Sequence, residues 1–430
     1  MGYNFFQIKE VSGVFNKKLN DFRNSLGAAI SQGQNIPFAD SDVSYVLKLQ
    51  NERIRRKGID LDYSTYVRRD KGENSRFIAG SDWEDAHYHS TVCFNSTGVK
   101  RIVKRGGSVA YRDDIRSVFY GTITDVTTGS HPDNDPYSCP NCGSVSTVSA
   151  LQNGCSYCGT RFRMDELFPK ITSYYFLEDA GMTKKELLSG FLKFYPFTAL
   201  GTYILTCIIK PEVYLPWNLI HNIPTLIGMI FGIGLGSIPM AYILYVYFLF
   251  MRLIVKAIAN TGKMGTAGSR AKFESRMKRI SPEFSYEYFT SKVLSLIKTA
   301  VFSQDESQLM FYRGGALDPK MKDIIDLNYG GALGCRTFVD EGNFVTVETK
   351  AYFDVLYANE SKVYSKSQVF SATLRRRTDI PVNMNFSMTR IACPSCGASF
   401  DATRLKNCPY CGNEYDGISD DWVLVDLRIM

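Results

Sequence analysis

The sequence predicts an α+β protein with two cytosolic domains, each carrying an inserted four-cysteine zinc ribbon and joined by a two-helix transmembrane hairpin. Three observations lead to this prediction. Two long runs in the centre of the chain are almost free of charge. In both flanks, meaning the regions before and after these runs, helical spacing of apolar residues gives way to alternation with a period of two. Eight of the 11 cysteines fall in CxxC pairs. The net charge of +7, with 45% hydrophobic and 13% aromatic residues, excludes a disordered or collagen-like chain.

The predicted boundaries follow from these features. In chain order, the expected parts are an α+β domain (1–180) with its ribbon (137–162), a transmembrane hairpin (181–259) with helices at about 190–210 and 222–252, a basic linker (260–280), and a second α+β domain (281–430) with its ribbon (391–416). No secretory signal is expected, because charges such as Lys9, Lys17 and Asp21 interrupt Met1–Gln34.

Two apolar runs predict the membrane helices. Phe191–Ile209 contains one charge, Lys193, and Ile223–Met251 contains none. Both runs are close to or longer than the roughly 20 residues that cross a hydrocarbon core. An alternative divides the second run at Gly236–Pro239 into two shorter helices, which would give three spans and place the flanks on opposite sides.

The distribution of charge favours two spans. Basic residues lie on both flanks, whereas the connection between the runs carries only Lys210 and Glu212. By the positive-inside rule both termini are cytosolic, and we expect a multi-pass protein of a bacterial cytoplasmic (inner) membrane. The basic residues after the second run could bind membrane lipids at about 1 kcal/mol each, or could serve only to fix the topology. They are Arg252, Lys256, Lys263, Arg270, Lys272, Arg276, Lys278 and Arg279.

Four CxxC pairs, each followed by glycine and called a knuckle here, predict the two zinc ribbons. Two residues between the cysteines of each pair let both thiolates reach one ion, and a following glycine supplies the left-handed backbone of the turn. The aromatic residue four positions after the last cysteine, Phe162 or Tyr415, is expected to pack over the knuckle. The predicted ligands are Cys139, Cys142, Cys155 and Cys158, with 12 residues between the inner two, and Cys393, Cys396, Cys408 and Cys411, with 11.

The expected cofactor is one structural Zn²⁺ ion in each ribbon. Four thiolates complete a tetrahedron and leave no position for a substrate, so the sites do not imply catalysis. A reducing cytosol favours metal binding over disulfides. Two alternatives stay open at this point: paired disulfides, and a mononuclear iron site of the rubredoxin type, which uses similar knuckles.

The C-terminal flank has the pattern of a helix followed by a curved antiparallel sheet. A first helix is expected where Phe289, Val293 and Ile297 recur at helical spacing, and a second short helix is expected around Pro319–Leu327. Val345–Tyr357 alternates with a period of two and is expected to pair with Val363–Arg375, and Val382–Met388 continues the pattern. Trp422–Ile429 is the expected closing strand, so the ribbon is inserted into the tip of a hairpin.

Residues 281–430 resemble the C-terminal domain of the mitochondrial inner-membrane translocase subunit that tethers the import motor, and its bacterial membrane-protein relatives. The resemblance implies a cystatin-like, or nuclear-transport-factor-like, α+β cone that binds proteins or membrane lipids. Integral spans and inserted ribbons are departures from the mitochondrial members, so motor tethering is not implied. The resemblance is carried by Phe284–Phe302, Gly330–Gly331, the hairpin of Phe344–Tyr357 with Lys362–Arg376, and Trp422–Ile429.

The N-terminal flank is expected to have a related design. A helix is predicted at Val14–Ile30, and a strand follows the ribbon at Lys170–Phe176. This strand, ribbon, strand order matches the C-terminal flank, which leads to the hypothesis that the two domains are related. The strands expected before the ribbon are Asp62–Val67, His87–Phe94, Lys100–Val103 and Val118–Val126.

The sequence favours a protein that is not an enzyme. It contains no phosphate-binding loop, no HExxH pair, no nucleophile elbow and only four histidines. We expect a membrane-anchored binding or assembly module whose C-terminal sheet binds a protein segment or lipid on its concave face. One alternative is an enzyme that uses the cavity of the cone. Another is a nucleic-acid-binding protein, which is disfavoured by the acidic residues Glu414, Asp416, Asp420 and Asp421 after the second ribbon. The sequence does not determine the partner or the oligomeric state.

Overall fold

The computed structural model forms two compact units. The first contains residues up to Asp179 together with those from Gly265 onward, and the second contains Ala180–Met264. The predicted alternation at Val382–Met388 lies outside the described residues. The structure describes residues 9–68, 76–130, 132–179, 184–214, 216, 223–259, 261–380, 390–401, 405–419 and 421–430.

The N-terminal flank forms a six-stranded antiparallel sheet. Its strand order is β1-β3-β4-β5-β8, and β2 is also paired with β4. The two predicted strands at His87–Phe94 and Lys100–Val103 are one continuous strand, β4, which pairs with β3 over its first half and with β2 over its second half. The strands are β1 (Lys9–Glu10), β2 (Ile59–Val67), β3 (Ile78–Glu84), β4 (Tyr88–Arg105), β5 (Ser108–Val126) and β8 (Lys170–Glu178).

The C-terminal flank forms a four-stranded antiparallel sheet in the order β14-β11-β10-β9. The predicted central hairpin is confirmed, since β10 and β11 pair continuously from Phe344 opposite Arg377 to Ala358 opposite Val363. The inward side chains of β10, such as Val347, Ala351 and Phe353, are at most 1% exposed. The strands are β9 (Ile324–Asp340), β10 (Phe344–Ala358), β11 (Val363–Arg377) and β14 (Val423–Ile429).

The two sheets share the order of strands around the ribbon. In each, a central hairpin (β4–β5 or β10–β11) is followed by a ribbon and then by a strand, β8 or β14, that pairs with the second strand of the hairpin. On its other side, the first strand of the hairpin pairs with β2 and β3 in the case of β4, and with β9 in the case of β10. This agreement supports the hypothesis that the two flanks are related.

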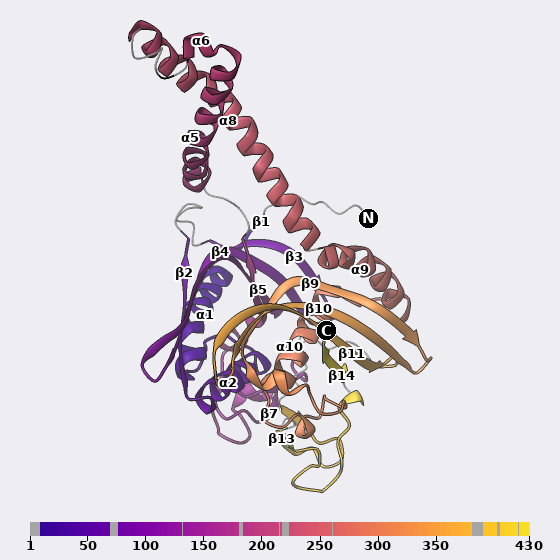
Figure 1. Ribbon diagram of the computed structural model, residues 1–430. Coiled ribbons are helices and arrows are strands. Elements are labelled where there is room, and N and C mark those ends of the chain that lie inside the picture. Colours follow the sequence, from indigo (N-terminus) through magenta and orange to yellow (C-terminus); the bar gives the residue numbers. More distant parts are fainter. Residues whose placement is uncertain are drawn as a thin grey trace. The chain divides into compact units, whose positions relative to one another are not determined.

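Three helices lie together on the concave side of the sheets (Figure 1). They are α1 (Gly13–Gln32), capped by Ser12, α2 (Ser41–Arg56) and α10 (Tyr286–Phe302), capped by Ser285. Helix α10 buries Phe289, Val293 and Ile297 completely, which follows from their spacing on one face. The helix α2 was not predicted, although Val43, Val46, Leu47 and Ile54 have helical spacing and are buried.

The two flanks, predicted as separate domains, share one unit. Helix α10 packs on α2, and β8 lies beside β9. The side chain of Asn328 on β9 accepts from Phe176 N–H at 3.1 Å and donates to its carbonyl at 2.8 Å. Arg101 on β4 donates to Asp326 on β9 at 2.7 Å, and both residues are buried. Hydrogen bonds and apolar packing therefore connect the flanks.

The second unit contains two helices that are long and apolar enough to cross a membrane. Their apolar stretches are Leu187–Ile209 and Ile223–Met251, within α5 (Lys184–Ile209) and α8 (Ile223–Ala259), and a short α6 (Pro211–Tyr214) follows α5. The helices pack against each other, with Tyr245 of α8 close to Gly190 of α5. Helix α8 continues through Pro239, so the alternative that divides it there is wrong.

Two segments differ from the prediction. Residues 261–280, expected as a linker, form the helix α9 (Thr261–Ile280), whose Phe273 and Met277 are buried in the C-terminal core. The expected helix around Pro319–Leu327 is a 3-10 turn, η3 (Pro319–Asp323), and Ile324 already belongs to β9. A further 3-10 turn is η2 (Glu306–Gln308).

Candidate metal centres

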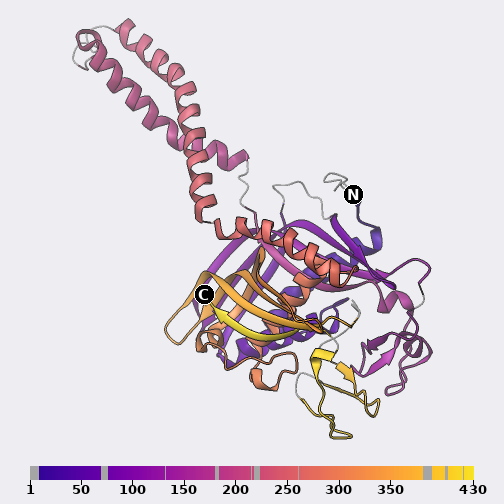
Figure 2. The same cartoon turned by 90° about the vertical axis from the view of Figure 1, so that its right-hand side faces the viewer.

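Each ribbon is a short hairpin inserted between neighbouring strands of a sheet. The hairpin strands β7 and β12 lie next to each other, so the two ribbons are side by side within the first unit (Figure 2). The elements of the first ribbon are β6 (Pro136–Ser138), β7 (Val145–Thr147), α3 (Val148–Asn153) and α4 (Met164–Leu167). Those of the second are β12 (Arg390–Ala392), β13 (Ser399–Asp401) and η4 (Gly417–Ser419).

All four knuckles have the same backbone geometry. In each, the glycine N–H donates to the carbonyl of the first cysteine at 2.7 or 2.8 Å, and the N–H of that cysteine donates to the carbonyl after the glycine at 2.8 or 2.9 Å. The four glycines have φ between 69° and 77°, a region that other residues rarely adopt. The glycines that follow each pair are therefore required by the turn, as predicted. They are Gly143, Gly159, Gly397 and Gly412.

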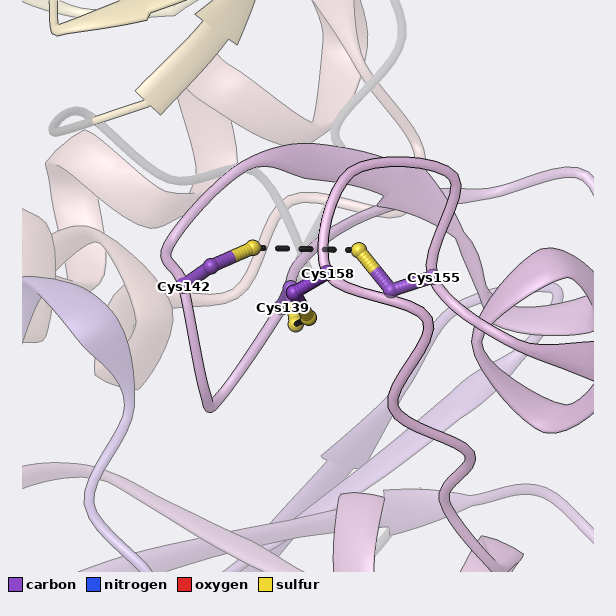
Figure 3. Close-up of side chains that lie close together, drawn as sticks. All are labelled: Cys139, Cys142, Cys155 and Cys158. Carbon is purple, nitrogen blue, oxygen red and sulfur yellow. Dashed lines mark hydrogen bonds between the residues drawn. The ribbon is translucent and has the colours of Figure 1, made fainter.

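The eight predicted ligands gather into two groups of four, in which all sulfur atoms lie within 4.8 Å of one another. In the first group, Sγ of Cys142 is 3.7 Å from that of Cys155 (Figure 3), and Sγ of Cys139 is 3.8 Å from that of Cys158. In the second, the corresponding distances are 3.7 Å between Cys396 and Cys408 and 3.6 Å between Cys393 and Cys411. Sulfur atoms about 2.3 Å from a central Zn²⁺ in a tetrahedron are about 3.8 Å apart, so each group fits one ion.

The same distances argue against disulfides. A disulfide requires sulfur atoms about 2.05 Å apart, and all of these cysteines are free thiols. Tetrahedral four-thiolate geometry accepts iron as well as zinc, so the geometry supports a metal site without selecting the metal.

The thiols of each group differ in pKa, which hydrogen bonds lower for some of them, whereas burial raises the pKa of Cys139 to about 12. The hydroxyl and the backbone N–H of Thr160 lower the pKa of Cys158 to about 6. The backbone N–H of Cys396 lowers the pKa of Cys393 to about 7. Because thiolates are the metal-binding form, these contacts favour ligation at neutral pH by Cys158 and Cys393.

The two ribbons are attached to the sheets in different ways. The first has a small hydrophobic cluster of its own, in which Val148 and Leu151 pack with Phe168 and with Phe162, the aromatic residue predicted over the knuckle. The second contributes Ile391, Phe400 and Tyr415 to the large core of the C-terminal flank. Both predicted aromatic residues are thus packed against the ribbons.

A buried lysine connects the first ribbon to helix α1. Nζ of Lys18 donates to the carbonyl oxygens of Asp165, Phe168 and Pro169 at 2.8, 3.1 and 3.1 Å. These carbonyls lie where the chain leaves the ribbon and enters β8. Burial lowers the pKa of Lys18, because the charged form loses its water, and the carboxylates of Asp125 and Asp165 oppose this shift.

The predicted lipid-facing cations divide into three groups. The side chains of Arg252, Lys256 and Lys263 lie outside the described residues. On α9, Lys272 and Arg279 are exposed. The others contact the first unit itself: Arg270 pairs with Glu287, Lys278 pairs with Glu274 at 2.7 Å, and the Arg276 guanidinium lies 5.6 Å from the centre of the Phe338 ring.

A cleft beside the first ribbon was not predicted from the sequence. It has a volume of about 830 Å³ and is lined by the connection from α1 to α2, one face of α2 and the first knuckle. Lys48 and Arg55 are exposed on the α2 wall, and Cys139 and Gly143 belong to the opposite wall. The cleft depends on contacts between distant segments, which no local sequence pattern signals.

Comparison with known families, characterised proteins and solved structures gives no match for this chain. The translocase-like resemblance of residues 281–430 therefore stays a prediction.

Proposed function

We propose that the protein is a non-enzymatic binding or assembly module, anchored in a bacterial cytoplasmic membrane by α5 and α8 and stiffened by two structural Zn²⁺ ions. The observation that carries this proposal is the presence, in one chain, of two closed four-cysteine groups and two long apolar helices. A four-thiolate site leaves no position for a substrate, and its binding energy stabilises a small ribbon instead.

The shared core of the flanks supports a membrane topology with two spans. Residues before α5 and residues after α8 pack into one unit through buried contacts such as Arg101 with Asp326. Such packing requires both flanks to lie on the same side of the membrane, and hence an even number of crossings. Together with the excess of Lys and Arg outside the short connection, this favours a cytosolic position for both flanks.

We further propose that the C-terminal flank is a cystatin-like cone related to the translocase domain. Its four strands curve around α10, as that resemblance implies (Figure 1). The concave face of this cone is filled by the protein's own core, since Val345, Val347 and Val355 are at most 1% exposed. The partner-binding surface must therefore lie elsewhere.

The cleft beside the first ribbon is the proposed site for a protein segment. Its walls carry both signs of charge, with Lys48 and Arg55 on α2 and Glu166 on α4. One wall is the knuckle that contains Cys139, so metal binding would also shape the cleft. Exposed cations of α9, Lys272 and Arg279, are the proposed contacts for anionic lipid.

Crosslinking and mass spectrometry of the protein in its native membrane test the proposed binding function. A partner crosslinked to the cleft should be recovered with the wild type and reduced at least about ten-fold by K48E/R55E, since interfacial charge reversals cost several kcal/mol. The matched control is K320E/K322E, which reverses two exposed lysines on η3. Equal recovery with both variants would refute the cleft as the site.

Metal analysis of the same preparation tests the cofactor. We expect two zinc ions per chain, as two groups of four cysteines imply. Stoichiometric iron, or a metal-free protein with oxidised sulfurs, would overturn the assignment of zinc.

A further inference from the structure

Strand β6 of the first ribbon has a free edge that borders the cleft. Among the described strands β6 pairs with β7 alone, and Tyr137, Ser138 and Cys139 line the cleft. Strand β7, on the other side of this hairpin, lies next to β12 of the second ribbon. An unpaired strand edge offers N–H and carbonyl groups to which another extended chain can bind.

The register of the β6–β7 ladder leaves the main-chain groups of Ser138 without a partner on β7. The N–H of Cys139 donates to the carbonyl of Ser144 at 2.8 Å, and the preceding residue, Ser138, is aligned with Val145. In an antiparallel ladder, pairs that exchange hydrogen bonds alternate with pairs that do not, so Ser138 and Val145 exchange none. The N–H and the carbonyl of Ser138 therefore point away from β7, towards the free edge.

The side chain of Ser138 also lacks a partner. Its Oγ is buried and has no hydrogen-bond partner among the described residues. A buried hydroxyl without a partner costs free energy, which a ligand in the cleft would recover by forming the missing hydrogen bond. One residue of the cleft wall thus offers a main-chain donor, a main-chain acceptor and a hydroxyl group.

The charges of the cleft lining indicate which side chains its occupant carries. Asp40 pairs with Lys170 at 3.1 Å. Glu166 accepts a hydrogen bond from the N–H of Arg163 at 2.7 Å. The other charged residues of the lining all belong to α2 and form no hydrogen bond or ion pair with the part of the chain that the structure describes; they are Lys48, Glu52 and Arg55. Two cations and one carboxylate leave this wall with a net positive charge, which complements an acidic side chain.

We propose that the cleft binds an extended, acidic protein segment by strand addition to β6, with main-chain hydrogen bonds to Ser138 and a carboxylate directed to Lys48 and Arg55. This assignment rests on the proposed function of the cleft, and it specifies how the segment is held and what chemistry it has. In strand addition the main-chain bonds supply affinity and alternate side chains supply specificity. A helical segment would not fit this role, because its main-chain groups are already bonded within the helix.

Selection from a phage library of random linear peptides on the full-length protein in detergent tests this binding mode. Peptides enriched by the wild type should contain Asp or Glu, and fluorescence anisotropy of the synthetic peptides then measures their affinity. Ser138→Pro removes the outward N–H but no bond of the β6–β7 ladder, so it should weaken binding at least about ten-fold. Ser138→Ala removes only the hydroxyl and should weaken binding by about five-fold or less.

The matched control is Ala392→Pro in the second ribbon. Ala392 also precedes the first cysteine of its ribbon, is aligned with Ser399 in the β12–β13 ladder and does not line the cleft. The N–H of Cys393 donates to the carbonyl of Ala398 at 2.9 Å, so the outward position of the Ala392 N–H is the same. This variant should bind the enriched peptides as the wild type does.

Methylation of the peptide nitrogens keeps the test decisive if Ser138→Pro fails to fold. A bound strand presents alternate N–H groups to its neighbour, so methylation of one alternate set should abolish binding and methylation of the other should not. Peptides that bind Ser138→Pro as tightly as the wild type, or that tolerate methylation at every position, would overturn strand addition but leave the cleft as the site. Enriched peptides whose binding K48E/R55E does not weaken would overturn the cleft itself. A selection that enriches no peptide would overturn the binding of an extended segment, whereas a partner crosslinked in the native membrane would still support the proposed function.

Discussion

At the residue scale, one buried arginine fastens the two flanks together through main-chain groups. Arg53 on α2 donates to the carbonyl oxygens of Val301 at 2.8 Å and of Ser303 and Met321 at 3.0 Å. Val301 lies in the last turn of α10 and Ser303 is its C-cap. Carbonyl groups at this end of a helix have no N–H donor within the helix, so they need a donor from elsewhere. Arg53 therefore caps a helix that follows it by about 250 residues.

Replacing Arg53 by methionine should lower the free energy of unfolding by about 2–4 kcal/mol, because buried carbonyls lose their donors. Denaturant unfolding of the full-length protein in detergent, followed by tryptophan fluorescence to which the buried Trp422 contributes, measures this change. Arg55→Met alters an exposed arginine on the same helix and should change the stability by less than about 0.5 kcal/mol. Equal effects of the two substitutions would contradict the capping role.

The burial of Lys298 has a consequence for stability at alkaline pH. Burial lowers the pKa of Lys298 to about 8 from its usual 10.5, against the opposing effect of Asp326. Between these values the unfolded chain binds more protons than the folded one, so stability rises with pH. The charge penalty is present in full below pH 8 and is relieved towards pH 10.5.

This residue should add about 3 kcal/mol of stability between pH 8 and pH 10.5. Tyrosines, cysteines and other lysines titrate in the same range, so the measured quantity is the difference between wild type and Lys298→Met. Parallel pH profiles for the two proteins would show that Lys298 is not the source.

At the element scale, the ribbons could be predicted because their geometry is local. Each knuckle closes within a few residues, from Cys139 to Ser144 in the first case, and needs only two cysteines and a glycine at fixed spacing. The hairpin of β10 and β11 was also predicted, since its two faces differ in burial and its residues therefore alternate.

Elements that depend on distant contacts could not be predicted in this way. Ile324–Leu327 begins β9 with four consecutive buried residues, because both faces of the strand are covered, and the period of two is lost. Helix α9 has few apolar residues apart from Phe273 and Met277, so its sequence looks like a linker until the C-terminal core covers that face. The cleft beside the first ribbon has no local signal either.

The different attachment of the two ribbons predicts unequal effects of metal loss. Cys142 and Cys396 are both exposed second cysteines of a first knuckle, so their serine variants are a matched pair. Cys396→Ser should loosen Ile391 and Phe400 in the large C-terminal core, whereas Cys142→Ser should disturb a small separate cluster.

We expect each variant to bind one zinc ion fewer than the wild type. The unfolding midpoint of Cys396→Ser should lie about 3 °C below that of Cys142→Ser, which corresponds to roughly 2 kcal/mol for a unit of this size. Differential scanning fluorimetry and metal analysis of the purified variants measure both quantities. A lower midpoint for Cys142→Ser would show that the first ribbon is the more important one.

At the scale of the whole molecule, the main finding is that one core is built from segments on both sides of the apolar helices. Sequence patterns indicate each flank separately but carry no sign that Arg101 meets Asp326, or that Asn328 joins β9 to β8. The repeated strand order suggests how this arose, since two related halves can pack as a pseudo-symmetric pair.

The shared core restricts the membrane topology, because both halves must fold in the same compartment. Epitope tags inserted at Gly107 and Gly342, in exposed turns of the N-terminal and C-terminal sheets, should therefore be cleaved by protease from the same side of sealed membrane vesicles. A tag at Glu212, between the two apolar helices, should be cleaved only from the other side. Gly107 and Gly342 tags on opposite sides would require an odd number of spans, which a core joined by Arg101 and Asp326 does not allow.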